Sequence, residues 1–203
     1  MFAKAMFAPS LTWTWLSTKV TDNRWWDYIT EHIIVSAMPT AAVLEELRTE
    51  GVRAVVTLNE DWELFMMPDP REYGMVQLHL PTQDYFFAPG FNDIDSALYF
   101  IEDHVSRGEK VMVHCKAGRG RSVSVVLCYI VWKTGMSVDA AFNAIRQRRR
   151  QINLSPKQRE SVQTYCNEVF RGSRPGDRRH GHRGDSPTAD ELLSSALADE
   201  DEQ

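Results

Sequence analysis

The residues with the clearest chemical potential lie in one short stretch, residues 114–122, which reads His-Cys-Lys-Ala-Gly-Arg-Gly-Arg-Ser. An apolar strand-like run, residues 110–114, leads into it, and an apolar helical pattern, residues 121–133, follows it. A loop that joins a strand to a helix N-terminus directs successive backbone N–H groups inward, and the helix dipole adds positive potential. Gly118 and Gly120 allow the tight turn and the close backbone approach that such a loop needs. The stretch therefore predicts a cradle for an anion such as phosphate.

Cys115 is placed to act as a nucleophile within this cradle. The loop N–H groups, the helix N-terminus and the cations Lys116, Arg119 and Arg121 all favour its thiolate, so its pKa should fall well below about 8.5. A thiolate beside a bound phosphoryl group can attack phosphorus. Arg121 follows Cys115 by six residues, and its planar guanidinium can bind two phosphoryl oxygens and stabilise the transition state. The hydroxyl of Ser122 can donate a hydrogen bond to the sulfur and help it leave in a second step.

The spacing His-Cys-x-x-Gly-x-x-Arg-Ser, set between a strand and a helix, resembles the signature of cysteine-based phosphatases of the dual-specificity type. The resemblance implies metal-independent hydrolysis of a phosphomonoester through a phosphocysteine intermediate, with no cofactor. Cys115, Arg121 and Ser122 would be catalytic. The substrate phosphate would be bound by the loop residues Lys116, Ala117, Gly118, Arg119 and Gly120. The alternative is a glycine-rich turn with an inert cysteine, which the flanking strand and helix patterns disfavour.

The reaction also needs a general acid for the leaving alcohol. The resembled family keeps an aspartate on a loop after an upstream strand, and residues 80–84, Leu-Pro-Thr-Gln-Asp, occupy that place. Asp84 is therefore the candidate. Protonated, it would donate to the leaving oxygen; ionised, it would activate the water that hydrolyses the phosphocysteine. Asp93 and Asp95 are rivals by position, but they fall at the start of a predicted helix, where acidic residues are common.

A narrower resemblance extends over about residues 25–170. Its pieces are residues 25–29 (WWDYI), 58–63 (LNEDWE) and 80–84 (LPTQD), together with the catalytic loop. In order and spacing they are similar to the mitochondrial protein tyrosine phosphatase-like lipid phosphatases, especially those of plants and algae, which dephosphorylate phosphatidylglycerophosphate. The resemblance implies an anionic phospholipid substrate, a role in phospholipid (cardiolipin) synthesis and peripheral association with a membrane.

The same resemblance assigns substrate contacts to an acidic loop. Glu60, Trp62 and Glu63 match the family's acidic-acidic-aromatic-acidic loop near the active site, with tryptophan where animal members have tyrosine. The alternative for this segment is a solvated acidic turn with one packed aromatic. The family implies a location in the mitochondrion, at the inner membrane surface, or in a plastid, and the sequence leaves the cytoplasm open.

Charge is distributed unevenly along the chain. The formal net charge is −5, but residues 107–150 carry ten basic and two acidic groups, whereas residues 51–106 carry two basic and ten acidic groups. The overall acidity argues against broad nucleic-acid binding, while the basic block suits a locally recognised polyanion. Lys116 and Arg119 suit a substrate that bears a second phosphate. A further cluster is either a set of ordinary cations at a helix C-terminus or part of a face for anionic lipid headgroups: Arg146, Arg148, Arg149 and Arg150.

The pattern of strands and helices indicates how these residues are positioned. Predicted strands cover residues 33–35, 52–58, 75–80 and 110–114, and predicted helices cover residues 41–50, 92–108, 121–133, 138–149 and 156–170. This alternation indicates an α/β cysteine-dependent phosphatase fold, with a mostly parallel central sheet flanked by helices. The 203 residues divide into an N-terminal arm (1–24), a dual-specificity-type phosphatase domain (25–170) and a disordered tail (171–203).

The first 21 residues contain no acid and several aromatic side chains. We favour a poorly ordered arm that packs on the domain over an organelle-targeting or membrane-interface segment. No apolar run reaches the roughly 18 residues that a membrane-spanning helix needs. The three cysteines are too few for a disulfide framework and indicate a reducing compartment.

Several other residues are given ordinary roles. Cys128 and Cys166 fall in helical patterns and are interpreted as core thiols. Gln158 is interpreted as a solvent-facing helix residue rather than one that orients the hydrolytic water. His180 and His182 lie in the tail, where two histidines in a basic run are weak support for a metal site.

The main hypothesis is a phosphatase for phosphatidylglycerophosphate, with no nucleic acid as a partner and no prediction of oligomeric state. The alternatives are a phosphoprotein (Tyr/Ser/Thr) or phosphoinositide phosphatase, and an RNA 5′-phosphatase, for which the basic block would also be suitable. A non-catalytic protein that only binds phosphorylated partners is disfavoured because Cys115, Arg121 and Asp84 are all present.

Overall fold

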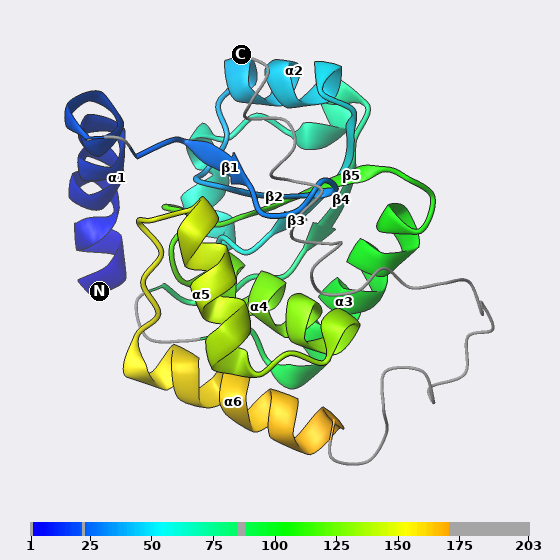
Figure 1. Ribbon diagram of the computed structural model, residues 1–203. Coiled ribbons are helices and arrows are strands. Elements are labelled where there is room, and N and C mark those ends of the chain that lie inside the picture. Colours follow the sequence, from blue (N-terminus) through cyan, green and yellow to red (C-terminus); the bar gives the residue numbers. More distant parts are fainter. Residues whose placement is uncertain (1, 22, 85–87, 171–203) are drawn as a thin grey trace.

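One mixed sheet of five strands forms the centre of the molecule in the computed structural model, which describes residues 2–21, 23–84 and 88–170 (Figure 1). The strand order is β1-β2-β5-β3-β4. The strands are β1 (Trp26–Tyr28), β2 (Ile33–Ser36), β3 (Val52–Thr57), β4 (Val76–His79) and β5 (Lys110–His114). Strands β2, β5, β3 and β4 are parallel, and β1 is antiparallel to β2. The mostly parallel sheet predicted from the sequence is confirmed.

The register of the sheet brings the ends of four parallel strands to one edge. His114, at the end of β5, is paired with Ser36 of β2 and Thr57 of β3, and Thr57 is paired with His79 of β4. In parallel sheets, ligands bind beyond the carboxyl ends of the strands. The segments after β3, β4 and β5 therefore start side by side at this edge.

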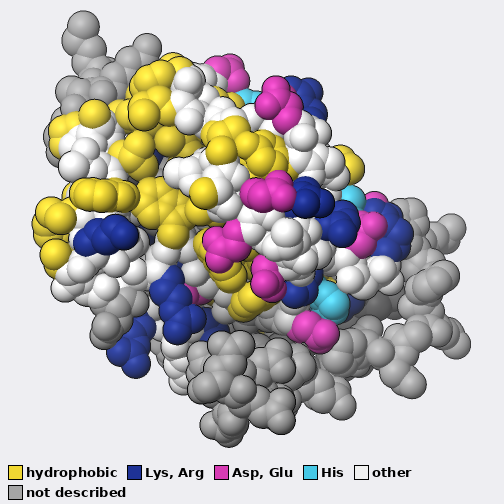
Figure 2. Space-filling model, turned by 90° about the horizontal axis from the view of Figure 1, so that it is seen from above, with side chains coloured by type: hydrophobic (Ala, Val, Ile, Leu, Met, Phe, Trp, Pro, Cys, Tyr) yellow, Lys and Arg dark blue, Asp and Glu magenta, His cyan; other side chains and the backbone are white. Residues whose placement is uncertain are grey.

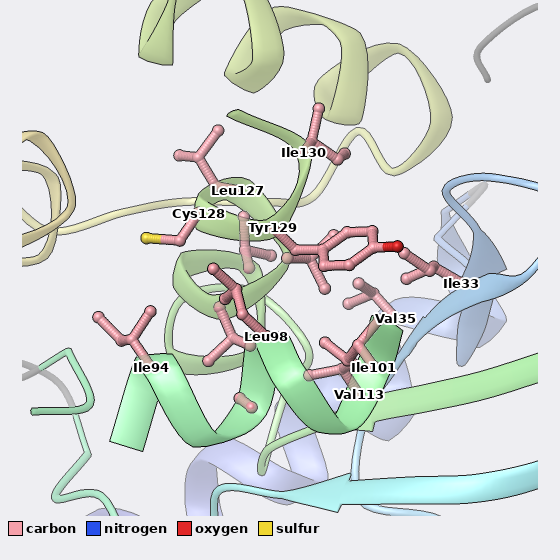
Figure 3. Packing of buried hydrophobic residues seen from close by; sticks show 14 of the residues in the cluster. Ile33, Val35, Ile94, Leu98, Ile101, Val113, Leu127, Cys128, Tyr129 and Ile130 are labelled. Atoms are coloured by element: carbon pink, nitrogen blue, oxygen red, sulfur yellow. The ribbon is translucent and has the colours of Figure 1, made fainter. Parts of the chain in front are cut away.

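Helices cover both faces of the sheet. On one face lie α3 (Phe91–Val105), α4 (Arg121–Thr134), α5 (Val138–Arg148) and α6 (Pro156–Phe170), and on the other lies α2 (Ala41–Thr49). Strand side chains alternate between the two layers: Ile33 and Val35 pack with α3 and α4, and Ile34 packs with α2. Figure 3 shows the larger layer, where residues of α3 and α4 meet those of β2 and β5.

The helices and strands predicted from periodicity are present, with small changes at their ends. Thr40 and Ser137 cap α2 and α5 through their hydroxyls, as Ser and Thr commonly do at helix N-termini. Helix α3 begins at Phe91 after Gly90, one residue before the predicted Asn92. Three short elements were not predicted: β1 and two 3₁₀ helices, Asp61–Met66 (η1) and Pro70–Tyr73 (η2).

The prediction of a poorly ordered N-terminal arm is wrong, because residues 2–20 form a helix, α1 (Phe2–Val20). Its many Ser and Thr hydroxyls donate to carbonyls of the preceding turn, as in Thr14 Oγ1 to Ser10 O (2.9 Å) and Ser17 Oγ to Thr14 O (2.8 Å). Phe7, Thr14 and Ser17 are buried, so the helix packs on the domain as predicted.

The tail predicted to be disordered, with His180 and His182, lies outside the described residues. Within the described part of the chain, no helix has both the length and the apolar character needed to cross a membrane.

Candidate active site

The predicted cradle lies where β5 ends and α4 begins. Strand β5 ends at His114 and α4 starts at Arg121, so residues 115–120 connect them at the carboxyl edge of the sheet. Gly120 is the N-cap of α4 and has no side chain to accept from the first N–H groups of the helix. Gly118 has a φ of +62°, and a Cβ there would lie 2.6 Å from the carbonyl oxygen of Ser36. Glycine is therefore required at position 118 by both backbone conformation and space.

The carbonyl groups of this loop have hydrogen-bond partners on its outer side. Lys116 O accepts from the backbone N–H of Met38 (3.2 Å), and Arg119 O accepts from that of Asn153 (3.0 Å). Between them, Gly118 O accepts from Arg149 Nε at 2.7 Å. Because C=O and N–H point in opposite directions across a trans peptide, carbonyls paired outside leave N–H groups free to face inward. This is the arrangement that a phosphate cradle requires.

Cys115 is buried at the base of the loop, 3% exposed. Its Sγ lies 3.4 Å from Ser122 Oγ. Burial raises the pKa of the Cys115 thiol, but the charge of Arg121 and hydrogen bonds from Ser122 lower it by more. The pKa therefore lies below its ordinary value, despite an opposing effect of the nearby Asp84 carboxylate. The site favours the nucleophilic thiolate.

Arg121 is fully buried and points toward the ends of the neighbouring strands. Glu63 accepts two hydrogen bonds from it, at 2.6 Å to Nη1 and 3.1 Å to Nη2. Arg121 Nη1 also donates to the carbonyls of Leu58 (3.2 Å) and Thr82 (2.8 Å). Burial lowers the pKa of Arg121, but the negative charges of Cys115, Asp84 and Glu63 raise it above its ordinary value. The guanidinium is thus held as a fixed cation beside Cys115.

The acidic loop is not a solvated turn. Residues 61–63 lie in η1, with Glu60 as its N-cap. Glu63 is 0% exposed, and its Oε2 also accepts from the backbone N–H of Glu60 at 2.8 Å. The structure therefore places Glu63 against Arg121, where it orients the cation. Trp62 is half-buried, and its ring packs edge-on against Phe7 of α1 with a centroid separation of 5.4 Å. Glu60 is half-buried.

Asp84 reaches the same cluster from the loop after β4. Its Oδ1 lies 3.1 Å from Arg121 Nη2, and its Oδ2 lies 2.5 Å from Lys116 Nζ. The rival Asp95 instead accepts a hydrogen bond from the hydroxyl of Tyr165, and Asp93 lies in the first turn of α3. Of the three candidate carboxylates, Asp84 is the one paired with the cations around Cys115.

The two variable cations of the loop have different surroundings. Lys116 is buried, 3% exposed, and pairs with Asp84. Arg119 is half-buried and donates from Nη2 to Ser17 Oγ of α1 at 3.3 Å. The two cations therefore differ in burial and in partner: Lys116 is paired with the candidate acid, and Arg119 joins the loop to α1.

Two interpretations of side-chain exposure need correction. Gln158 does not face solvent: it is 3% exposed, and a Cβ on Gly120 would lie 2.8 Å from its Oε1. It lies in the first turn of α6, where its Oε1 accepts a hydrogen bond from the backbone N–H of Ser155 (3.0 Å). Arg149 is not part of a surface cluster either, since it is 1% exposed and donates to Asp27 Oδ2 at 2.5 Å. Its neighbours Arg146 and Arg150 are exposed.

Sequence reasoning missed the contribution of Asp27 and Arg149 to this site. Asp27 stands in an aromatic segment, and Arg149 stands in a run of arginines, so neither has a local pattern that distinguishes it. The one indication in the sequence is that residues 25–29, which include Asp27, belong to the family resemblance. Cys128 and Cys166 are buried next to each other, between α4 and α6 (Figure 3 labels Cys128), as predicted for core thiols.

A thiolate-favouring cysteine below a loop of inward N–H groups, with a fixed arginine, at the carboxyl edge of an α/β sheet, defines a cysteine-dependent phosphatase. A model of the dual specificity phosphatase catalytic domain matches residues 33–168. The chain belongs to this family and is a cysteine-based phosphatase.

Named relatives agree with this class. The phosphatidylglycerophosphate phosphatase PTPMT2 of Arabidopsis thaliana is 39% identical over 165 residues, which cover 80% of this chain and 72% of the relative. A second protein of that plant, the phosphatidylglycerophosphate phosphatase PTPMT1, is 37% identical over 166 residues. That match covers 80% of this chain but 49% of the relative, so the chain spans about half of its length.

A solved structure has the same fold. The crystal structure of PTPMT1 in complex with PI(5)P is similar with a TM-score of 0.70 and 28% identity, over 74% of this chain and 100% of that chain.

Proposed function

We propose that this enzyme hydrolyses phosphatidylglycerophosphate to phosphatidylglycerol, a step in phospholipid (cardiolipin) synthesis. The observation that carries the proposal is the similarity to two proteins named as phosphatidylglycerophosphate phosphatases. The site agrees with it chemically, because Lys116 and Arg119 add two cations beside the cradle. Phosphatidylglycerophosphate carries a phosphodiester close to its terminal phosphomonoester, and these cations suit that second anionic group.

Substrate binding would begin with an exchange of anions. Asp84 now pairs with Arg121, the cation that the scissile phosphoryl group needs, and with Lys116, one of the two cations that suit the second anionic group. The incoming phosphate would displace the carboxylate from Arg121 Nη2 and would bind the loop N–H groups of residues 116–121. Glu63 would remain on Arg121 and keep its guanidinium plane in place.

In the first chemical step, the Cys115 thiolate would attack phosphorus, forming an S–P bond as the bond to the leaving oxygen breaks. Asp84, protonated, would give its proton to that oxygen and release the glycerol hydroxyl of phosphatidylglycerol. Arg121 and the loop N–H groups would stabilise the charge on the equatorial oxygens.

In the second step, a water would attack the phosphocysteine while the Asp84 carboxylate takes its proton. The S–P bond would break, phosphate would leave, and Ser122 Oγ, which lies 3.4 Å from the sulfur, would stabilise the returning thiolate. Gln158 is buried beside Gly120, so its amide is near enough to the loop to orient that water.

We also propose that the enzyme acts at a membrane, because its lipid substrate resides there, and that it does so at the mitochondrial inner membrane or in a plastid. This placement rests on the family resemblance. A second candidate substrate is a phosphoinositide, which is favoured by the similarity to a structure whose bound ligand is PI(5)P.

The test is a panel of substrates presented to the purified full chain. Phosphate release would be measured from phosphatidylglycerophosphate and phosphatidylinositol phosphates in matched micelles, and from a phosphotyrosine peptide and a 5′-triphosphate RNA. We expect kcat/KM to be highest for phosphatidylglycerophosphate, by about tenfold or more. A higher value for a phosphoinositide would favour the second candidate, and a higher value for the peptide or the RNA would overturn the lipid assignment.

The matched control for the panel is Cys115→Ser. The hydroxyl is a much weaker nucleophile at neutral pH, so phosphate release should fall below detection while substrate binding is retained. Full activity of this variant would overturn the phosphocysteine mechanism.

A further inference from the structure

From Trp13 onward, helix α1 buries polar residues and exposes its large apolar ones. Thr14 and Ser17, together with Phe7, are buried, whereas Trp13 is 59%, Trp15 54%, Leu16 40% and Val20 66% exposed. This is the reverse of the usual pattern for a helix on a domain surface. The exposed apolar face is therefore suited to contact with an apolar partner rather than with water.

The inner face of α1 is attached to the active site. The Phe7 ring contacts Trp62 at 5.4 Å and Phe65 at 5.9 Å between centroids, and Lys116 Nζ lies 5.8 Å from the same ring. Arg119 donates to Ser17. Phe65, which is 73% exposed, and Met66, which is 63% exposed, extend the apolar surface from α1 onto η1.

Basic residues border this apolar surface. Lys19 and Arg24 are exposed, and Arg24 O accepts from Gln151 Nε2 at 2.9 Å, which places the exposed Arg150 on that side as well. The exposed acidic residue of η1 is Asp61, and its Oδ1 lies 3.7 Å from Nδ1 of His79. The side of the molecule where α1 lies in Figure 1 shows a broad apolar patch in Figure 2, with lysine and arginine side chains nearby. Aromatic residues beside cations match the interface of an anionic bilayer.

We infer that α1 and the tip of η1 form a membrane-docking surface, made of Trp13, Trp15, Leu16, Val20, Phe65 and Met66, for an anionic lipid bilayer. The inference deepens the proposed function and rests on it for the choice of occupant. Lys116 and Arg119 contact the inner face of α1, so a bilayer on the outer face would be separated from them by one helix diameter, about 10 Å. A lipid headgroup could then enter the cradle while its acyl chains stay in the membrane.

The experiment measures vesicle binding without any substrate. Co-sedimentation of the full chain would be compared on vesicles of phosphatidylcholine with phosphatidylglycerol and on pure phosphatidylcholine. The variant is Trp13→Gln with Trp15→Gln, and the matched control is Val76→Gln with Tyr99→Gln, which removes two large exposed apolar residues at 55% and 50% exposure elsewhere. Circular dichroism would check that each variant keeps its helices.

We expect the wild-type chain to prefer the anionic vesicles, the α1 variant to bind them about tenfold or more weakly, and the control to bind like wild type. Hydrolysis of a soluble aryl phosphate should be equal in all three. Absence of wild-type binding, or equal binding by the α1 variant, would overturn the inference. A wild-type dimer that the α1 variant dissociates, without vesicle binding, would overturn it in favour of a second copy as occupant. Binding as expected without hydrolysis of phosphatidylglycerophosphate would instead count against the proposed function.

A second observation, independent of the first, concerns Arg149. Its guanidinium donates to two carbonyls of the catalytic loop, Gly118 O at 2.7 Å and Ala117 O at 3.4 Å, and to Asp27 Oδ2 at 2.5 Å. It also donates to the carbonyls of Arg24 (3.3 Å) and Trp25 (3.4 Å). One buried side chain thus joins the loop to the segment before β1.

We propose that Arg149 is a positioning residue, which keeps the Ala117 and Gly118 carbonyls outside the cradle so that the loop N–H groups face the substrate. Without this donor, two buried carbonyls would lack their partner, and a peptide flip would direct oxygen toward the phosphate. The positive charge of Arg149 also interacts favourably with the Cys115 thiolate. Arg149 therefore acts through the loop rather than by touching the substrate.

The test separates charge from hydrogen-bond geometry. Arg149→Gln, Arg149→Lys and the exposed control Arg146→Gln would be compared by the pH dependence of Cys115 alkylation and by inhibition with inorganic phosphate. We expect Arg149→Gln to move the alkylation midpoint to higher pH and to weaken phosphate inhibition about tenfold. In Arg149→Lys the alkylation midpoint should be closer to the wild-type value than the phosphate inhibition is. The ammonium keeps the positive charge, but it does not reproduce the paired N–H donors of the guanidinium.

A wild-type midpoint and wild-type inhibition in Arg149→Gln would overturn the proposal. If that variant does not fold, wild-type phosphate inhibition in Arg149→Lys would overturn it equally. Arg146→Gln should change neither measurement.

Discussion

Two buried arginine–carboxylate pairs hold the catalytic loop, and they differ in what the cation faces. Arg121, paired with Glu63, lies inside the site and also contacts the Asp84 carboxylate. Arg149, paired with Asp27, contacts backbone carbonyls on the outer side of the loop. Both guanidinium groups are almost fully buried. The two pairs have the same chemistry but different uses: Arg121 supplies a cation for the substrate, and Arg149 supports the backbone of the loop.

The surroundings explain the difference between the two cations. The charges of Cys115, Asp84 and Glu63 outweigh burial and raise the pKa of Arg121, whereas burial lowers the pKa of Arg149 in spite of Asp27. Arg121 therefore lies where negative charge is concentrated, which is also where a phosphate would bind. A buried ion pair is therefore not enough to identify a catalytic arginine. The catalytic arginine is identified by the further negative groups that face it, here Cys115 and Asp84.

The sharpest test of this comparison is the same substitution at both arginines. Arg121→Lys removes the fork that faces the transition state, so kcat on an aryl phosphate should fall about 10²–10³-fold. Arg149→Lys keeps a charge behind the loop, and kcat should fall about tenfold or less. Steady-state kinetics of both variants provide the measurement. Equal losses would mean that the two pairs are not functionally distinct.

Asp84 pairs with Arg121 inside the site. The effect of removing its carboxylate should therefore depend on the leaving group of the substrate. Asp84→Ala should slow hydrolysis of an alkyl phosphate about 10²-fold or more, because the alcohol leaves only when it is protonated. An aryl phosphate with an acidic leaving group should be slowed far less. The ratio of kcat/KM for the two substrates measures this, and equal losses on both would contradict the role of Asp84 as general acid.

Removal of the carboxylate partner should destabilise the fold at either arginine, but it should lower kcat chiefly at Arg121. Asp27→Asn removes the carboxylate that pairs with the buried Arg149, and Glu63→Gln removes the carboxylate that binds both Nη atoms of Arg121 and leaves Asp84 facing it. Each change should cost about 3 kcal/mol in the free energy of unfolding. Urea unfolding would measure this loss. Glu63→Gln should in addition lower kcat, and a Glu63→Gln variant with wild-type kcat would show that Arg121 needs no orienting partner.

The last effect appears only in acid and concerns His114, at the end of β5, whose Nε2 lies 2.9 Å from Thr57 Oγ1. Burial, with a smaller contribution from the charge of Arg121, lowers the pKa of His114 from 6.5 to about 3. Its contribution to stability is full above pH 6.5 and is lost as the pH falls toward 3, at up to about 1.4 kcal/mol per pH unit. Its NMR signals should not titrate between pH 7 and 5, and a midpoint near 6.5 would contradict this.

Much of the site could be predicted from the sequence because its parts are contiguous or follow a strand. Cys115, Arg121 and Ser122 lie on one loop and in the first turn of the helix after it, and the strand pattern before them and the helix pattern fix the type of this loop. Asp84 could be predicted through the family resemblance, which places an aspartate on this loop, and the structure gives the physical reason: the loop follows β4 as Cys115 follows β5, and parallel strands end at the same edge. The orientation of Glu63 could not be predicted, since an acidic turn reads as solvated until its buried partner is known.

The sequence by itself determined the chemistry and the layered fold, because both depend on local signals: residue types at fixed spacing and the periodicity of apolar residues. Only the tertiary structure decided which charges are buried against which. It paired Arg149 with Asp27 across 122 positions of the chain and Arg121 with Glu63 across 58. It also placed α1 beside the cradle with its tryptophans outward. These contacts depend on segments that meet only after the sheet has formed, so no local pattern in the sequence encodes them.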